Sequence, residues 1–352
     1  MRRYGISPAT AIEQAQKEQP SGVSFEPLPP PTGAAPYRLS YVDLGIAPVG
    51  PGKPPRTFHV IGDSGGVLVP TYQQDVANAM IADTPAYPSV AFAYHVGDVV
   101  YFFGDEQLYG PQFYEPYVNY NRPIVAIPGN HDGAGSPSLA GFVENFCAST
   151  AHLDPAAEEY NRDTMTQPNV YWTLNDDAVT IIGLYSNVPS GGVIKPDQAK
   201  WLQEELTMAP TDRPLIVALH HPPYSCDAMH GGSKKMGAVL DAAFATAGRW
   251  PEVVLSGHVH NYQRFSRKLN GNGKSIAYFV VGGSGYHNTH PMAQNAAPKL
   301  LVTPDTTLEA FDATQYGFLR LTVTGMSISG EYVGVAKEGS VTPNVDSFTV
   351  GG

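Results

Sequence analysis

Five short apolar segments, each ending abruptly in a polar cluster, constrain the fold of this chain more than any other feature. They cover residues 57–61, 90–96, 123–127, 215–219 and 253–255. Short apolar runs of this kind are typical of strands that are buried on both faces. Segments with helical spacing lie at residues 71–82, 138–149, 197–208 and 233–248, and Asp197 is the expected N-cap of the third. Strands that alternate with helices predict an α/β core.

Other segments predict that the sheets are mixed rather than wholly parallel. Residues 171–174 and 178–185 flank an Asn-Asp-Asp turn and predict a hairpin. Further strands are expected at residues 275–281, 317–323 and 327–335. Before residue 56 the chain is polar and then proline-rich, which favours a surface extension with an edge strand within residues 37–46. We therefore expect an N-terminal extension, residues 1–55, and one folded domain, residues 56–352.

The composition excludes several classes of protein. Of 352 residues, 42% are hydrophobic and 15% are charged, which suits a large core and not a disordered chain. A net charge of −11 argues against a nucleic-acid backbone or an anionic membrane as partner, but not against a small anionic substrate beside a bound cation.

The same composition bears on location and on the cysteines. No segment approaches the length of a membrane span and no secretory signal is visible, so we expect a protein that is cytoplasmic, or exported with its signal removed. Cys147 and Cys226 fit no metal-binding pattern, and free thiols are favoured over a disulfide. The oligomeric state stays open.

The polar clusters at the strand ends contain the residue types that bind metal ions. They read GDSG at 62–65, GDVVY at 97–101, GNHD at 129–132, HHPP at 220–223 and GHVH at 257–260. Carboxylate and phenolate oxygens suit a small trivalent cation, whereas imidazole and amide ligands suit Zn, Mn or ferrous iron. Two ions that share a bridging carboxylate are common machinery for displacement at phosphorus. Asp98 is the candidate bridge, because it is central in the set and Tyr101 follows three residues later.

This ordered set of motifs resembles the calcineurin-like metallophosphoesterases, and within them the purple acid phosphatases. Gly65 and Tyr101 stand where many members of the wider superfamily have a histidine and a further carboxylate, which is the pattern of the purple subgroup. The resemblance covers about residues 57–265, and residues 317–335 are similar to the family's terminal strands. It implies a four-layer α/β/β/α sandwich with mixed sheets, in which residues 56–352 form the catalytic domain.

The resemblance also implies a ligand set and a reaction. The ferric site would take Asp63, Asp98, Tyr101 and His260. The divalent site, for Zn, Mn or Fe, would take Asp98, Asn130, His220 and His258. In the implied reaction a metal-bound hydroxide attacks the phosphorus of a small phosphate monoester that also contacts Asn130. His131 would contact the phosphate and protonate the leaving group, with Asp132 orienting it.

Alternatives remain for the function and for several other residues. The same ligands would serve a phosphodiesterase or a nucleotide-pyrophosphate hydrolase, and a metal- or phosphate-binding protein without turnover is less favoured. His221 is equally consistent with substrate contact and with support of the neighbouring ligand. The glycine-rich loop that carries His287 is interpreted as a plain turn. The histidines assigned to surface or core structure are His59, His95, His152, His230 and His290.

Overall fold

All five apolar segments form buried strands in the computed structural model, which describes residues 26–50, 54–153, 160–187, 191–269 and 274–351. These strands are β2 (Arg56–Ile61), β3 (Val90–His95), β4 (Ile124–Ala126), β7 (Leu215–Ala218) and β8 (Val253–Ser256). Every residue in them is buried, as expected for strands that are covered on both faces.

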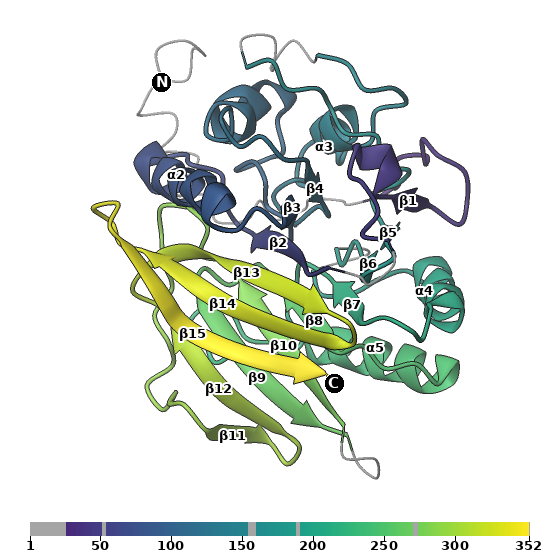
Figure 1. Ribbon diagram of the computed structural model, residues 1–352, viewed down its shortest axis with the longest axis vertical. Coiled ribbons are helices and arrows are strands. Elements are labelled where there is room, and N and C mark those ends of the chain that lie inside the picture. The colour runs from purple at the N-terminus through teal and green to yellow at the C-terminus, as the bar shows by residue number, and fades with distance from the viewer. Residues whose placement is uncertain (1–25, 51–53, 154–159, 188–190, 270–273, 352) are drawn as a thin grey trace.

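The strands of the described residues form two mixed sheets (Figure 1). One sheet has six strands in the order β15-β14-β13-β2-β3-β4, and the other has nine in the order β1-β5-β6-β7-β8-β10-β9-β12-β11. β2, β3 and β4 run parallel, and so do β6, β7, β8 and β10. In the six-stranded sheet, β13 (Tyr316–Thr324), β14 (Ser327–Val335) and β15 (Val341–Gly351) add antiparallel pairs.

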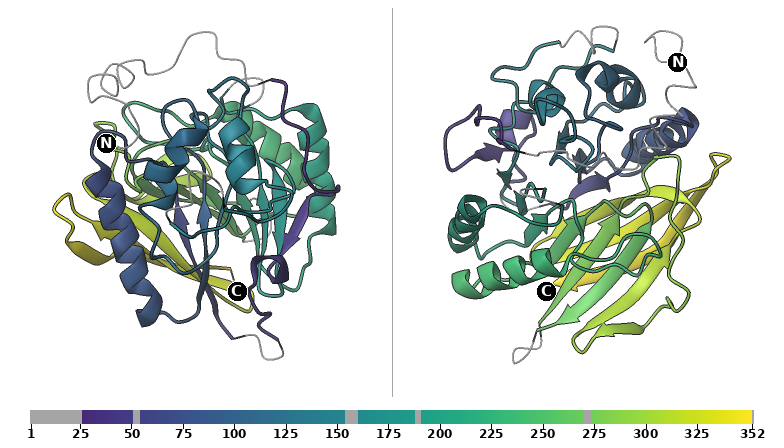
Figure 2. Two further views of the ribbon diagram at one scale, coloured as in Figure 1. Left: turned by 90° about the horizontal axis from the view of Figure 1, so that it is seen from above. Right: turned by 180° about the vertical axis from the view of Figure 1, so that it is seen from behind.

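Helices cover the outer face of each sheet. α2 (Pro70–Ala86) and α3 (Ala140–Phe146) pack on the six-stranded sheet, and α4 (Pro196–Met208) and α5 (Lys234–Ala247) pack on the nine-stranded sheet. Seen from above, α2 lies on one side of the two sheets and α4 and α5 lie on the other (Figure 2). Between the sheets lies an apolar core to which Phe92 and Ile216 contribute. The α/β/β/α sandwich expected from the sequence is confirmed.

The four expected helices are present with shifted ends. α4 begins at Pro196 with Lys195 as its N-cap, so the expectation that Asp197 caps it is wrong. Proline's preset φ angle suits the first helical position, which places Asp197 inside the first turn. Ser233 caps α5 with its side chain, and Gly248 ends α5 in the left-handed conformation.

The remaining elements lie at the edges of the sheets and between the strands. The hairpin of β5 (Trp172–Asn175) and β6 (Thr180–Gly183) forms as expected, and β1 (Arg38–Ser40) pairs with β5 as an edge strand. β10 (Ser275–Val281) coincides with its expected segment. The additional strands are β9 (Tyr262–Lys268), β11 (Leu300–Thr303), β12 (Thr306–Asp312) and β15. The short helical segments are η1 (Val42–Leu44), η2 (Glu106–Leu108) and the π-helical η3 (Gly110–Tyr114).

Two smaller expectations concern the cysteines and the membrane. Cys147 is buried and Cys226 is half-buried, and both are free thiols. None of the helices in the described part of the chain combines the length and the apolar character that crossing a bilayer requires. Residues 1–25, which belong to the expected N-terminal extension, lie outside the described residues.

Candidate metal centre

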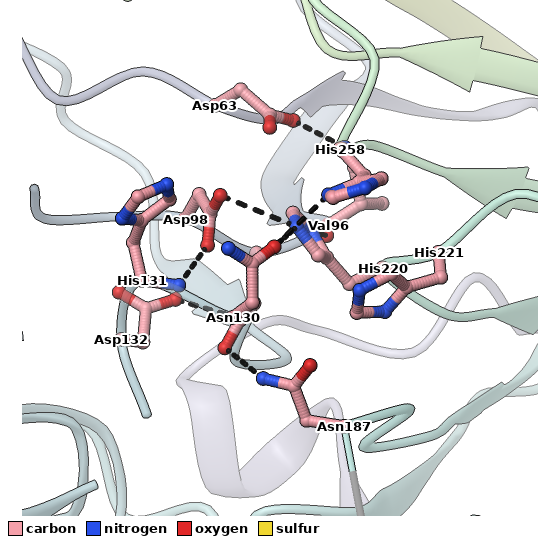
Figure 3. Close-up of polar contacts among 12 residues, drawn as sticks. Asp63, Val96, Asp98, Asn130, His131, Asp132, Asn187, His220, His221 and His258 are labelled. Atoms are coloured by element: carbon pink, nitrogen blue, oxygen red, sulfur yellow. Dashed lines mark hydrogen bonds and ion pairs between the residues drawn. The ribbon is translucent and has the colours of Figure 1, made fainter. Parts of the chain in front are cut away.

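The polar clusters converge because they follow strands that end at the same side of the two sheets. Asp63 follows β2, Asp98 follows β3 and Asn130 follows β4, and these three strands pair in parallel register. His220 and His258 follow β7 and β8, which pair in parallel in the facing sheet. Carboxyl ends of parallel strands are where α/β proteins place their sites. Figure 3 shows the five side chains pointing toward one another.

Three of the predicted ligands gather around the hydroxyl of a fourth, Tyr101. The Tyr101 Oη lies 3.4 Å from Asp63 Oδ1, 3.3 Å from Asp98 Oδ2 and 3.5 Å from His260 Nε2. His260 Nε2 in turn lies 3.5 Å from Asp63 Oδ1. These are the residues that the resemblance assigns to the ferric site.

A second group of ligand atoms adjoins the first through Asp98. His220 Nε2 lies 3.3 Å from Asp98 Oδ2 and 3.1 Å from Asn130 Oδ1. The Asn130 Oδ1 also lies 2.9 Å from Nδ1 of His258. The same oxygen of Asp98 therefore faces both groups, which is the position that a bridging carboxylate needs.

The spacing of these atoms fits metal coordination. Bonds of about 2.0–2.2 Å from a cation to nitrogen or oxygen place neighbouring ligand atoms about 2.9–3.6 Å apart. All of the separations given above, from 2.9 to 3.5 Å, fall in that range. Among the described residues, Asp63, Asp98 and His220 form a group whose ligand atoms all lie within 4.8 Å of one another.

Two histidines are held in the tautomer that a metal ligand requires. Nδ1 of His220 donates to the backbone oxygen of Val96 at 2.9 Å, and Nδ1 of His260 donates to that of Asn288 at 3.0 Å. A carbonyl can only accept, so each Nδ1 carries a proton, and Nε2 is the atom that would offer its lone pair to a metal ion. Both Nε2 atoms are the ones that face the carboxylates.

Two carboxylates are buried together at this site, so a positive charge beside them would be stabilised. Asp63 is fully buried, and burial together with the charge of Asp98 raises its pKa well above the usual value. Burial also acts to raise the pKa of Asp98, but the neighbouring His220 and His131 lower it below its usual range. Burial acts to lower the pKa of His220, yet Asp98 raises it to about 9. Cations would relieve the repulsion between the two carboxylates.

The backbone is bent sharply where it presents the ligands. Asp63, Asp98 and His258 have φ angles of +53°, +55° and +68°, in the left-handed region that side chains other than glycine rarely adopt. Such conformations cost free energy and gather at functional sites. Neighbouring glycines provide the space: a Cβ on Gly129 would lie 2.7 Å from Asp98 Cγ, and one on Gly257 would lie 2.5 Å from Asp63 Oδ2.

Gly65 makes the room that Tyr101 occupies. A Cβ at residue 65 would lie 2.8 Å from Cδ2 of the Tyr101 ring and 2.5 Å from Oε1 of Gln112. That Gln112 oxygen accepts the backbone N–H of Tyr101 at 2.9 Å. The two substitutions that set this chain apart from the wider superfamily pattern are therefore in direct steric contact.

His131 stands at the mouth of the ligand cluster, and Asp132 lies behind it. The backbone N–H of His131 donates to Asp98 Oδ1 at 2.8 Å, and its Nδ1 donates to the oxygen of Phe102 at 2.9 Å. The Asp132 carboxylate instead accepts backbone N–H groups, at 3.0 Å from Val99, 3.1 Å from Val100 and 2.8 Å from Gly129. The expectation that Asp132 orients His131 is corrected: Phe102 orients the ring, and Asp132 ties together the loops that carry Asp98 and Asn130.

A cavity of about 90 Å³ opens beside the ligand cluster, and part of its lining was not predicted from the sequence. His131 and Phe102 line one part of it, as does Asn130, the second residue expected at the substrate. Three histidines that were assigned to core, surface or a plain turn also line it: His230, His287 and His290. The His230 ring stacks on His258 at a centroid distance of 4.8 Å, and the His290 ring lies 4.3 Å from that of His260.

Other histidines lie outside the cavity lining. His221 is only 6% exposed, its Nδ1 pairs with Ser186 Oγ at 2.9 Å, and its ring lies 4.4 Å from that of His258. His221 thus packs against His258 and does not line the cavity beside the ligand cluster. His95 bonds Ser64 at 2.8 Å directly behind Asp63, within the fold as expected.

Comparisons with known proteins show the family of the chain. The calcineurin-like phosphoesterase family matches residues 56–262. Purple acid phosphatase 21 of Arabidopsis thaliana is 27% identical over 207 residues, which cover 57% of this chain and 44% of that protein. The Fe(3+)-Zn(2+) purple acid phosphatase 12 of the same plant is 27% identical over 202 residues, covering 55% and 38%. A probable glycerophosphodiester phosphodiesterase of Arcobacter nitrofigilis is 28% identical over 173 residues, covering 46% and 56%.

A solved structure shows the same fold. Purple acid phosphatase PPD1 from yellow lupin (Lupinus luteus) seeds superposes with a TM-score of 0.62 at 16% identity, covering 86% of this chain and 54% of that one. The chain thus spans less than half the length of the two plant relatives and just over half of the lupin chain.

Proposed function

Because the chain belongs to the calcineurin-like phosphoesterase family, we propose that it hydrolyses phosphate monoesters at a dinuclear metal centre of the purple acid phosphatase type. The observation that carries the proposal is the position of Tyr101. Its fully buried hydroxyl lies within 3.5 Å of two carboxylates and one imidazole nitrogen. Burial and the two neighbouring carboxylates raise the pKa of the Tyr101 phenol well above its usual value, so a phenolate at this place needs a bound cation, and a phenolate oxygen suits a hard trivalent ion.

The ligand atoms divide into a hard set and a softer set. The ferric ion would be held by Asp63, Asp98, Tyr101 and His260, whose ligand atoms include three oxygens. A divalent ion, Zn, Mn or Fe, would be held by Asp98, Asn130, His220 and His258, which contribute the shared carboxylate, an amide and two imidazoles. The presence of an Fe(3+)-Zn(2+) enzyme among the relatives supports this division.

The residues of the chain would bind the substrate and move its protons. When bound, the cations supply Lewis-acid neutralisation of the phosphoryl oxygens and lower the pKa of the attacking water. Asn130 and His131 line the cavity where a phosphoryl group would enter. The hydrogen bond from His131 Nδ1 to Phe102 leaves Nε2 as the atom that can hand a proton to the leaving-group oxygen. The small cavity supports a small phosphorylated molecule as substrate.

A phosphodiesterase is the second candidate, supported by the relative from Arcobacter nitrofigilis. A phosphate diester carries two organic groups and one negative charge, whereas a monoester carries one organic group and up to two charges. The two substrates therefore differ in the space and in the positive charge that they need from the cavity wall, although they would use the same metal ligands.

One comparison of substrates tests the proposal. The protein is loaded with iron and zinc, and kcat/KM is measured for a phosphate monoester and for a diester with the same leaving group. A strong preference for the monoester supports the proposal, and a preference for the diester favours the second candidate. Hydrolysis of neither substrate, with both metals measured as bound, contradicts an enzymatic function.

Colour tests the assignment of Tyr101. Tyrosinate bound to ferric iron absorbs visible light, so we expect Tyr101→Phe to abolish the purple colour of the iron-loaded protein. The phenylalanine ring fills the same buried space, so the melting temperature should stay close to that of the wild type. Tyr94→Phe is the matched control, because it removes the hydroxyl of another fully buried tyrosine, between the two sheets. A visible band that survives Tyr101→Phe would refute the assignment.

A further inference from the structure

A second tyrosine lies directly on the ring of Tyr101. The ring of Tyr286 stacks on it with a centroid distance of 4.1 Å and an angle of 25° between the planes. Tyr286 also meets the ring of His260 edge-on at 4.7 Å, so it contacts two of the predicted ferric ligands at once. It lines the cavity, but nothing in the reaction proposed above requires it.

The loop that carries Tyr286 is fastened to the metal centre. The backbone N–H of Tyr286 donates to the backbone oxygen of Asp63 at 3.0 Å, and Ser284 N donates to that of Gly62 at 3.2 Å. The Ser284 hydroxyl donates to Gly317 O at 2.9 Å. Gly285 has a φ angle of +135°, and a Cβ there would lie 2.5 Å from Gln73 Cα. Because the loop is held on several sides, the Tyr286 ring has a defined place over Tyr101.

We propose that Tyr286 is a positioning residue for Tyr101. Its stacked ring fixes the orientation of the phenolate ligand and makes that phenolate a stronger electron donor to iron. This inference rests on the proposed function, because it takes Tyr101 as a ligand of ferric iron. It concerns the electronic state of the ligand rather than a contact with the substrate.

The electrostatics of aromatic rings give the direction of the effect. The face of a tyrosine ring is electron-rich, so a second ring against it raises the energy of an electron held on the phenolate. The visible band moves such an electron from the phenolate to iron. Stacking therefore shifts the band to longer wavelength, and it favours ferric over ferrous iron because the phenolate donates more strongly.

Three variants of the iron-loaded protein test the inference by absorption spectroscopy and by titration of the reduction midpoint. Tyr286→Leu removes the aromatic face, and we expect the band to move to shorter wavelength and the ferric ion to be reduced more easily. Tyr286→Phe keeps a stacked ring with a less electron-rich face, so its band should lie between those of the wild type and Tyr286→Leu. The matched control is Tyr87→Leu.

The control separates the local effect from a general loss of stability. Tyr87 is 38% exposed, and the guanidinium of Arg320 lies over its ring at 3.6 Å. Tyr87 precedes β3, whereas the metal centre follows β3. The band of the Tyr87→Leu variant should match that of the wild type.

The possible failures are distinguishable. If the band of Tyr286→Leu lies at the wild-type wavelength, the inference is overturned. It is also overturned if Tyr87→Leu shifts the band as far as Tyr286→Leu does. Either result leaves the proposed function standing. If the wild type binds iron without any visible band, the ligand role of Tyr101 fails, and this inference fails with it. If Tyr286→Leu does not fold, the near-isosteric Tyr286→Phe decides, and an unmoved band in that variant overturns the inference.

Discussion

Replacing Gly129 by alanine should dismantle the metal centre while leaving most of the fold in place. A Cβ on Gly129 would lie 2.7 Å from Asp98 Cγ and 2.5 Å from Asp98 N. Ordinary contact begins near 3.4 Å, so the backbone of the loop that carries Asp98 must retreat by about 0.9 Å, and Asp98 Oδ1, which lies closer still to the added Cβ, must move farther. Asp98 is the carboxylate that faces both groups of ligands, so its retreat affects both predicted ions.

The size of the effect follows from that displacement. Overpacking of a buried site costs about 1–3 kcal/mol of folding stability. A misplacement of about 1 Å in a catalytic constellation lowers the rate on the order of 100-fold. The hydrogen bond of 2.8 Å from His131 N to Asp98 Oδ1 would also be strained, which displaces the expected proton donor. We therefore expect a moderate loss of stability and a loss of kcat/KM of about 100-fold or more.

Three measurements on Gly129→Ala check this reasoning: the metal content per chain, kcat/KM for a phosphate monoester, and the melting temperature. Gly231→Ala is the matched control, since a Cβ on Gly231 would meet no atom within 4 Å. It should behave as the wild type in all three measurements. If Gly129→Ala retains both metals and its kcat/KM stays within a few-fold of the wild type, the steric argument is refuted.

Three further expectations concern the proton donor, the charge of the site and a helix end. His131→Ala should lower kcat most for esters with poor, high-pKa leaving groups; equal losses across a leaving-group series would exclude it as the proton donor. In the metal-free protein the pKa of His220, raised from 6.5 to about 9, gives stability that is complete below pH 6.5 and is lost as the pH rises through 9. Denaturant unfolding between pH 6 and 10 should show a loss on the order of 3 kcal/mol, and bound metal should abolish it. Ser233→Ala should cost about 1 kcal/mol in the same unfolding assay by removing the cap of α5, whereas a change within error would contradict that role.

The sequence was a good guide to the parts of the fold that are both local and apolar. The strands β2, β3, β4, β7 and β8 are short runs of buried residues, so their positions could be predicted without knowledge of their partners. The candidate ligands follow these strands directly, and the parallel pairing then brings them together.

The strands that were missed depend on partners distant in the sequence. β9 (Tyr262–Lys268) contains mostly polar residues, and it is a strand because β10 and β12 pair with it on both sides. No local pattern in such a segment favours a strand over a polar loop. The edge strand β15 is largely exposed and has no apolar run, so its position also depends on its pairing with a distant partner, β14.

The part of the cavity wall that carries His230 and His290 could not be predicted, because two separate loops form it. His230 and His290 are sixty residues apart in the chain, and neither belongs to a motif. Their loops are joined by a bridge between Asp227 and Met292 and by a backbone hydrogen bond of 2.9 Å from Ala293 N to Cys226 O. Only this tertiary pairing brings the two rings to a centroid distance of 4.8 Å.

The contact between residue 65 and the ring of Tyr101 restricts the order in which this centre could have changed during evolution. Any side chain at residue 65 needs space that the Tyr101 ring fills. A chain with a histidine there must lose that side chain before it can accept the tyrosine, and the reverse path must lose the tyrosine first. The intermediate in either direction lacks one of the predicted metal ligands. The tyrosine-bearing and histidine-bearing forms are therefore separated by a step of weakened metal binding, and exchange between them should be rare.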